Sequence, residues 1–155
     1  MYNGIMDKEL SHIDELGRAR MVDVGHKQPQ RRTARATGDF VAVGTTLDRL
    51  VAGDLPKGEG LAVARVAGIA AAKRVDELIP LCHTLPLDCV SVDFEQVGSN
   101  RLRVTASASI TARTGVEMEA LTAVTVTCLT LYDMAKAIDR SIRIEDVKLI
   151  EKSKE

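Results

Sequence analysis

The chain has 155 residues, enough for one compact domain that buries a substantial core. Its 21 basic and 22 acidic residues give a net charge of −1, and only 3% of residues are aromatic, which argues against a nucleic-acid-binding module. The three cysteines form no CxxC pair, so we expect neither a disulfide framework nor a metal site. There is no apolar leader or membrane-length uncharged run, so we expect a cytoplasmic protein without membrane binding.

The N-terminal part reads as an arm followed by a strand. Residues 1–20 are polar and lack periodicity, so we expect a mobile arm there and a single domain over residues 21–155. The domain begins with a possible ordered piece at 21–24. The segment TARATGDFVAV, residues 33–43, has the composition of a strand, with Gly38 at a possible bulge.

Two helices are expected next. The first is short, residues 44–53, with Thr45 or Thr46 as the cap at its start and Gly53 just beyond its end. The second is longer and covers residues 61–79. The apolar stripe expected on this longer helix consists of Val63, Val66, Ala67, Ile69 and Ala70.

A constrained loop and a hairpin follow the second helix. Pro80 ends the helix, and LCHTLP at residues 81–86 lies between two prolines. Residues 89–97 and 101–112 are typical of two strands joined by a turn at 98–100.

The segment GVEMEALTAVTVTCLTLYDMAK, residues 115–136, is ambiguous because part of it alternates like a strand. Its uncharged run is long, and a good helical sequence follows, so we predict a buried helix and then a last strand at residues 142–152. Without the short helix the order is βαββαβ. The fold class expected is therefore α+β, a ferredoxin-like sandwich with an antiparallel sheet and helices on one face.

Asp133 and Lys136 share one face of this predicted helix because they are three residues apart. The simplest interpretation is a surface ion pair of little energetic value. The functional alternative is that burial at this helix end lowers the pKa of Lys136, so that it transfers protons near neutral pH with Asp133 holding it in place.

Other polar residues also allow two interpretations. Glu117 and Glu119 could stabilise the helix start, or one could bind the N–H and amino edge of a guanine or pterin. The neighbours Cys82 and His83 point different ways, which favours a ligand contact over a catalytic dyad or a shared metal. The segment PKGEG, which contains Lys57, resembles a phosphate-binding loop only loosely. The remaining basic residues are a solvated face unless several converge on a polyphosphate.

Three long motifs carry a family resemblance: MVDVGHKQPQRRTARA (21–36), AAKRVDELIPLCHTLPL (71–87) and TGVEMEALTAVTVTCLTLYDMAKAIDR (114–140). They resemble the MoaC family of molybdenum cofactor biosynthesis, from about His12 to Ser153. The resemblance implies a ferredoxin-like fold, a homohexamer built as a trimer of dimers, and active sites at subunit interfaces. It implies a lyase without a cofactor that converts (8S)-3′,8-cyclo-7,8-dihydroguanosine 5′-triphosphate into cyclic pyranopterin monophosphate and releases pyrophosphate.

The resemblance also implies roles for individual residues. Those matching catalytic positions are Asp133, Lys136 and Lys57, and those matching substrate-binding positions are Leu81, Cys82, His83, Glu117, Met118, Glu119, Arg32 and Lys152, the last two near the phosphates. We expect Lys136 to be the main general acid and base, and Lys57 to assist from across a subunit interface. Glu119 is expected to bind the guanine-derived edge.

The main alternative function is a non-catalytic, oligomeric domain that binds a small molecule, a common use of ferredoxin-like sandwiches. Such a domain needs a pocket but no paired lysines. A separation of more than about 10 Å between Lys57 and Lys136 across every interface would favour this alternative, because direct proton transfer needs hydrogen-bond reach.

Overall fold

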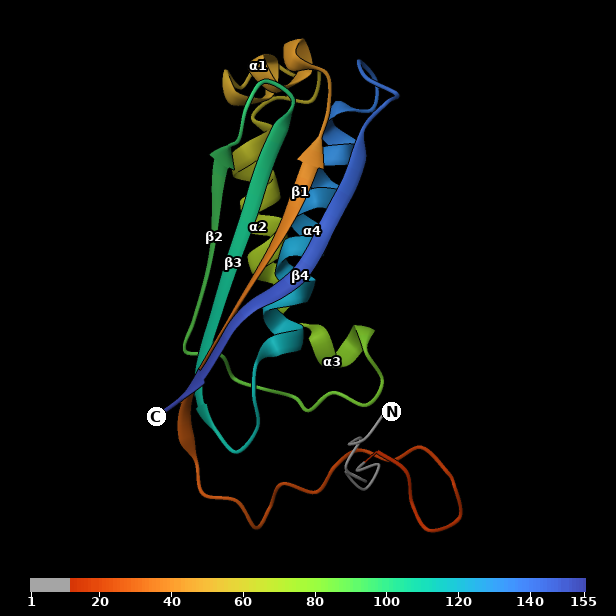
Figure 1. Ribbon diagram of the computed structural model, residues 1–155, viewed down its shortest axis with the longest axis vertical. Coiled ribbons are helices and arrows are strands. Elements are labelled where there is room, and N and C mark those ends of the chain that lie inside the picture. The colour runs from red at the N-terminus through yellow and green to blue at the C-terminus, as the bar shows by residue number, and fades with distance from the viewer. Residues whose placement is uncertain (1–11) are drawn as a thin grey trace, which may run out of the picture.

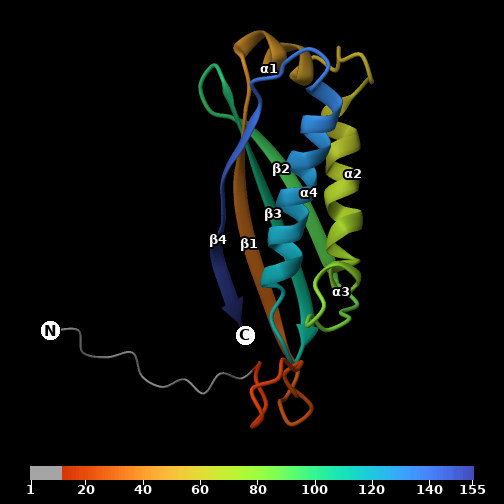
Figure 2. The same cartoon turned by 90° about the vertical axis from the view of Figure 1, so that its right-hand side faces the viewer.

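The computed structural model describes residues 12–155 and contains a single antiparallel sheet with helices on one side (Figure 1). In chain order the elements are β1 (Gln30–Val41), α1 (Gly44–Val51), α2 (Gly60–Ala72), α3 (Val75–Leu78), β2 (Cys89–Gln96), β3 (Arg101–Ala112), α4 (Glu117–Ala135) and β4 (Arg143–Lys154). The strand order is β2-β3-β1-β4 with antiparallel neighbours. Figure 2 shows α2 and α4 side by side on one face of this sheet. The predicted ferredoxin-like α+β sandwich is confirmed.

The predicted strands agree with the structure to within a few residues. The strand at 101–112 is exact, and the turn before it contains Gly98 in the left-handed region at φ +76°. The first strand begins at Gln30 rather than residue 33 and ends two residues earlier than predicted. The mobility predicted for residues 1–20 stays a prediction, and residues 1–11 of that arm lie outside the described part of the chain.

The end of α1 follows its sequence signal, but its start does not. Gly53 has φ +71°, and its N–H donates to the Leu50 carbonyl oxygen at 3.2 Å while the Asp54 N–H donates to that of Arg49 at 2.8 Å. This is the Schellman pattern, for which glycine is the preferred residue. The predicted threonine caps are wrong, because Val43 occupies the cap position and its N–H donates to the Asp139 carboxylate at 2.9 Å.

The long helix predicted at 61–79 is wrong in extent, because α2 ends at Ala72 and α3 follows as a separate turn. The predicted apolar stripe is also wrong. Val63 and Val66 are 47% and 67% exposed, whereas the residues that α2 buries are small: Gly60, Ala64, Gly68, Ala71 and Ala72. Periodicity favoured the larger side chains, but the packing of α2 on α4 requires small ones.

Gly68 marks the closest approach of the two long helices. A Cβ atom at this position would overlap Thr127 Oγ1 and lie 2.8 Å from the carbonyl oxygen of Ala123, both on α4. Thr127 is fully buried and its hydroxyl has no hydrogen-bond partner among the described residues. The helices are therefore in contact through their backbones, and α2 fixes the lateral position of α4.

A second glycine lets α4 approach the sheet. A Cβ atom on Gly38 would lie 2.7 Å from Val124 Cγ1 on α4 and 3.0 Å from Val147 Cγ2 on β4. The pairing of β1 with β4 shifts register here, and β4 carries the extra residue, with Asp146 at φ 55°. The irregularity predicted at Gly38 is thus confirmed, with the additional residue on the partner strand.

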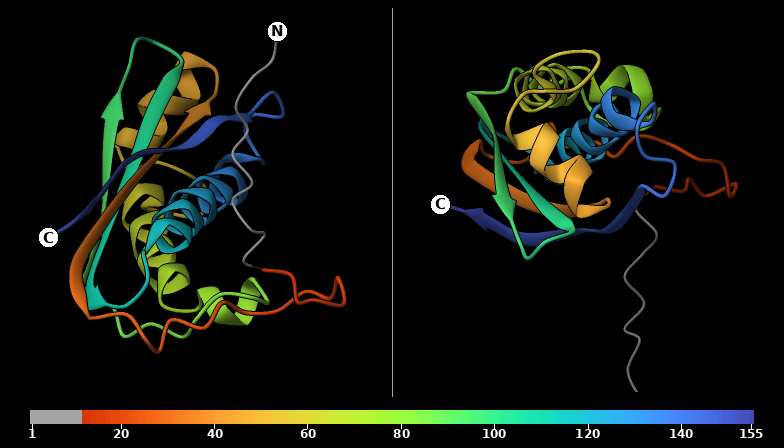
Figure 3. Two further views of the ribbon diagram at one scale, coloured as in Figure 1. Left: turned by 60° about the horizontal axis from the view of Figure 1, so that its bottom comes forward. Right: turned by 90° about the horizontal axis from the view of Figure 1, so that it is seen from above.

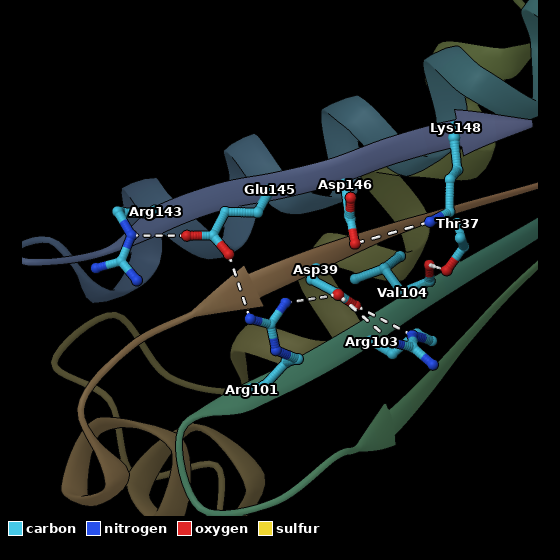
Figure 4. Close-up of polar contacts among 9 residues, drawn as sticks. All are labelled: Thr37, Asp39, Arg101, Arg103, Val104, Arg143, Glu145, Asp146 and Lys148. Carbon is cyan, nitrogen blue, oxygen red and sulfur yellow. Dashed lines mark hydrogen bonds and ion pairs between the residues drawn. The ribbon is translucent and has the colours of Figure 1, made fainter.

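The uncovered face of the sheet carries a polar network centred on Asp39 of β1 (Figure 4). Asp39 is only 2% exposed, and its carboxylate accepts hydrogen bonds from Arg101 at 2.7 Å and Arg103 at 3.1 Å. Burial by itself raises the pKa of Asp39, but the hydrogen bonds and charges of the two arginines bring it below its usual value. Arg101 also contacts Glu145 of β4 at 3.3 Å, so the network joins three strands.

Among residues 12–155, no helix has both the length and the apolar character needed to cross a membrane.

We predict that Gly68→Ala destabilises the fold by about 1–3 kcal/mol, because the added methyl group forces α2 and α4 apart. Helix propensity alone predicts the opposite sign, a gain of about 1 kcal/mol. Equilibrium urea unfolding at a fixed protein concentration measures the difference. The exposed Ala70→Gly variant on the same helix calibrates the propensity contribution, and a more stable Gly68→Ala protein would contradict the close packing described here.

Candidate active site

One carboxylate holds two lysines at the C-terminal end of α4. Lys57 Nζ lies 2.6 Å from Asp133 Oδ2, and Lys136 Nζ lies 2.8 Å from Asp133 Oδ1. Lys57 comes from the tight turn between α1 and α2, where Gly58 adopts φ +93°. All three residues belong to the same chain, so the expectation that Lys57 reaches this group from across an interface is wrong.

The charges of this group of three stabilise one another. Hydrogen bonds from Lys136 and then from Lys57 lower the pKa of Asp133 to about 2, and the hydrogen bond to Asp133 raises the pKa of Lys136. The three side chains are 47%, 53% and 55% exposed in chain order. The predicted burial of Lys136 with a lowered pKa is therefore wrong, because this helix end faces solvent and carries a counter-ion. In the isolated chain Lys136 is a protonated ammonium.

The opposite end of α4 opens onto a cavity of about 320 Å³. The loop after α3 and the start of α4 form two of its walls, and a third comes from the segment before β1, which runs beside that loop (Figure 3). Six residues predicted to bind substrate line this cavity together: Leu81, Cys82, His83, Glu117, Met118 and Glu119. We call it the acidic pocket, after its two glutamates.

Glu119 is the most deeply placed ionisable residue of the acidic pocket, with only 4% of its surface exposed. Burial raises the pKa of Glu119, and the nearby charges of Glu117 and Asp76 act in the same direction. Burial likewise raises the pKa of Cys82, with the charge of Glu119 as the next cause. The raised pKa of Cys82 disfavours the thiolate, so this side chain fits contact with a ligand better than covalent chemistry.

His83 is fixed by the segment that precedes the sheet. Its Nε2 lies 2.9 Å from the carbonyl oxygen of Val22. A carbonyl oxygen only accepts, so Nε2 carries the hydrogen and donates it to Val22. His83 thus fastens the loop after α3 to the segment before β1.

A second cavity, of about 370 Å³, lies next to the acidic pocket and shares Gly115 and Glu117 with it. Arg32, Lys152 and Lys154 line this basic cavity. Lys152 Nζ lies 3.2 Å from Glu117 Oε1, and Arg32 Nε donates to the Ala112 carbonyl oxygen at 3.1 Å. Basic residues that are far apart in the sequence therefore lie together in this cavity, as binding of a polyphosphate requires.

The predicted site residues form two groups that a single chain keeps apart. Glu119 and Asp133 are 14 residues apart on one helix, a separation of roughly 21 Å at 1.5 Å per residue. The helix begins at Glu117 and ends at Ala135, so both residues lie within it. Figure 1 shows the same separation, with α1 and the end of α4 at one end of the molecule and α3 at the other.

The wall contributed by the segment before β1 was missed by sequence reasoning. Its members in the acidic pocket are His12, Val22, Val24 and Lys27. This segment has no periodic pattern, and its long-range contact through Val22 cannot be read from local sequence. The available signal was that Lys27 lies inside MVDVGHK, the first of the motifs that resemble the MoaC family. Residues 12–155 contain no group of His, Cys, Asp and Glu arranged to hold a metal ion.

Comparison with known proteins decides the family. A family model described as "MoaC family" matches residues 21–155. The chain belongs to the MoaC family. The acidic pocket and the lysine pair on Asp133 therefore lie within a MoaC domain.

Several MoaC relatives are more than half identical to this chain. Cyclic pyranopterin monophosphate synthase 3 of Mycobacterium tuberculosis (strain ATCC 25618 / H37Rv) is 54% identical over 147 residues, 95% of this chain and 83% of the relative. Cyclic pyranopterin monophosphate synthase of Novosphingobium aromaticivorans is 56% identical over 144 residues, 93% and 91% of the two chains. The protein of the same name from Chloroflexus aggregans is 54% identical over 145 residues, 93% and 88%.

We predict that Lys136→Met raises the pKa of Asp133 from about 2 toward its ordinary value of 3.8, because the largest stabilising hydrogen bond is lost. Lys57→Met should do the same to a smaller extent. Since the folded-state pKa is lowered, any stability from this group is complete above about pH 4 and disappears as the pH falls toward 2. The side-chain carboxyl carbon shift of Asp133 in an NMR pH titration gives the values. An unchanged midpoint in both variants would rule out the paired geometry.

Proposed function

We propose that this chain is a cyclic pyranopterin monophosphate synthase, a lyase of molybdenum cofactor biosynthesis. Its substrate would be (8S)-3′,8-cyclo-7,8-dihydroguanosine 5′-triphosphate, and its products cyclic pyranopterin monophosphate and pyrophosphate. The observation that carries the proposal is the high identity to synthases of that name over nearly the whole chain. The two-lysine carboxylate group and the adjoining acidic and basic cavities supply chemistry that suits this reaction.

The two cavities fit the two halves of the proposed substrate. A triphosphate needs several cations to offset its charge, and Arg32, Lys152 and Lys154 line the basic cavity. The guanine-derived rings present N–H and amino donors, which suit the acceptors of Glu119 in the acidic pocket. Because the cavities share Glu117, one ligand can extend from one into the other. Pyrophosphate would leave from the basic cavity, where cations stabilise its developing charge.

Lys136 is proposed as the principal proton-transfer group. Its raised pKa means that it starts as a proton donor, so it would first act as a general acid in opening the purine-derived ring. Asp133 keeps the ammonium in place through the 2.8 Å contact. After giving up its proton, Lys136 is a free amine that can take a proton in the ring-closing step. Lys57, at 2.6 Å from the same carboxylate, is placed to assist.

The roughly 21 Å between the two groups of residues supports an active site shared by two chains. A two-fold axis near the middle of α4 would pair this helix with its copy in antiparallel orientation. The Asp133 end of one chain would then face the acidic pocket of the other. Exposed apolar side chains on the two long helices offer a surface for this contact: Val63, Val66, Leu129 and Tyr132. Three such dimers would make the homohexamer that the family resemblance implies.

A direct assay tests the function against the non-catalytic alternative. The protein is incubated with the cyclic dihydroguanosine triphosphate, and both pyranopterin and pyrophosphate are measured. A ligand-binding domain would bind the compound without releasing pyrophosphate. The position of Lys57 and Lys136 on a single carboxylate favours the enzyme, since paired lysines are the feature that a binding domain does not need.

We predict that Lys136→Ala folds, assembles and binds substrate but makes almost no product, because its general acid is missing. Isothermal titration calorimetry would give the affinity, and pyrophosphate release would give the rate. Lys148→Ala, which removes an exposed lysine of β4 paired only with Asp146 at 3.7 Å, is the matched control and should retain normal turnover. Near-normal turnover by Lys136→Ala would refute the assignment.

We predict that two impaired variants restore activity when mixed at a substrate concentration too low to saturate Glu119→Gln. Lys136→Ala damages one end of α4, and Glu119→Gln weakens substrate binding at the other. In a mixed dimer one of the two sites combines the intact ends of different chains, so random 1:1 mixing should restore about a quarter of wild-type activity. The variants must be mixed under conditions that allow subunit exchange. A mixture that exchanges subunits but stays inactive would show that both ends act within one chain.

A further inference from the structure

A small hairpin carries His12 to the acidic pocket. Ile13 and Ala19 form an antiparallel bridge, and the Arg20 N–H donates to the His12 carbonyl oxygen at 2.9 Å. The Asp14 N–H donates to the Arg18 carbonyl oxygen, also at 2.9 Å. The backbone of His12 therefore has a defined partner, and its side chain lines the pocket beside Lys27 and the loop after α3.

Asp14 braces this hairpin from within. Its Oδ1 accepts the N–H groups of Leu16 at 3.0 Å and Arg18 at 2.9 Å, while its Oδ2 accepts Arg18 Nε at 2.8 Å. Gly17 supplies the left-handed conformation at the turn, with φ +76°. Three hydrogen bonds to one carboxylate close the loop, which makes Asp14 a positioning residue for His12.

The two imidazoles of the acidic pocket differ in the ring nitrogens that remain free to bind a ligand. His83 already uses Nε2 on the Val22 carbonyl oxygen at 2.9 Å, which assigns it a structural contact. Neither ring nitrogen of His12 has a hydrogen-bond partner within residues 12–155, although the side chain lines the same cavity. Both ring nitrogens of His12 are thus available for hydrogen bonds with a bound ligand.

We propose that His12 is a substrate-contacting residue of the acidic pocket, forming a hydrogen bond to the guanine-derived ring system, with Asp14 positioning it. The inference rests on the proposed function. The ring system is the better partner than the phosphates, because the pocket sets two carboxylates, Glu117 and Glu119, against the single cation Lys27. The neighbouring cavity instead holds three cations, Arg32, Lys152 and Lys154. The ring nitrogens of an imidazole can form hydrogen bonds with the polar groups of such a ring system.

Chemical protection of the histidines tests the contact directly. Diethyl pyrocarbonate modifies accessible imidazoles, and both His12 and His26 are exposed, while His26 does not line the pocket. Lys136→Ala protein saturated with the cyclic dihydroguanosine triphosphate should show several-fold slower modification of His12 by mass spectrometry, with His26 unchanged. Equal modification of His12 with and without bound substrate would overturn the proposal.

Dissociation constants of variants measure how much His12 contributes to substrate binding. In the Lys136→Ala background, His12→Ala should weaken substrate binding about tenfold, the value of one hydrogen bond in a partly buried site. His26→Ala should leave the dissociation constant unchanged. Asp14→Ala should weaken binding when His12 is present and have no further effect in the His12→Ala protein, because Asp14 acts only through it. An unaltered dissociation constant in His12→Ala would overturn the proposal.

Turnover by the wild-type protein distinguishes a wrong role for His12 from a wrong proposed function. If the wild-type protein converts the substrate but His12 is neither protected nor required for binding, only the role of His12 is wrong. If the wild-type protein neither binds nor converts the substrate, the proposed function is wrong, and the role of His12 is overturned with it.

Discussion

Close packing of α4 against its neighbours is the constraint on which the rest of the structure depends. Gly68 lets α2 touch the backbone of α4 on one side, and Gly38 lets Val124 approach the sheet on the other. Neither contact leaves room for a methyl group, so the helix has little freedom to slide or tilt. Its two ends are therefore held at fixed places. The acidic pocket forms at one of them, and the lysine pair on Asp133 forms at the other.

The two ends differ in their electrostatics. At the C-terminal end two ammonium groups surround a single carboxylate in a solvent-exposed place, which leaves one net positive charge and keeps Lys136 protonated. At the N-terminal end Glu119 is buried without a cationic partner among the described side chains, and its pKa is raised. The basic cavity adjoins this end of the helix, so a ligand that carries both phosphates and ring N–H groups is complementary to the two neighbouring cavities, while the Lys136 ammonium at the other end is a proton donor.

The sequence predicted those features that local patterns determine. The hairpin of β2 and β3 and the glycine after α1 follow from turn chemistry, and the long uncharged run of α4 was identified as a helix. Features set by tertiary packing were not predictable. The buried face of α2 is its small-residue face because a backbone contact is required at Gly68. The family resemblance identified Lys57, Asp133 and Lys136 as candidate catalytic residues. Their exposure to solvent and the contact of both lysines with one carboxylate depend on the tertiary structure, and so does the position of His12 in the acidic pocket.

The irregular pairing of β4 has a consequence for colloidal stability. This strand lies at the edge of the sheet, where free backbone groups invite pairing with another chain. Its register shifts twice along β1, and Asp146 adopts a left-handed conformation at one of these shifts. Lysines at positions 148, 152 and 154 add charge along the same strand. A strand that is bulged and charged in this way is a poor template for sheet extension, so the irregular pairing of β4 protects the chain against aggregation.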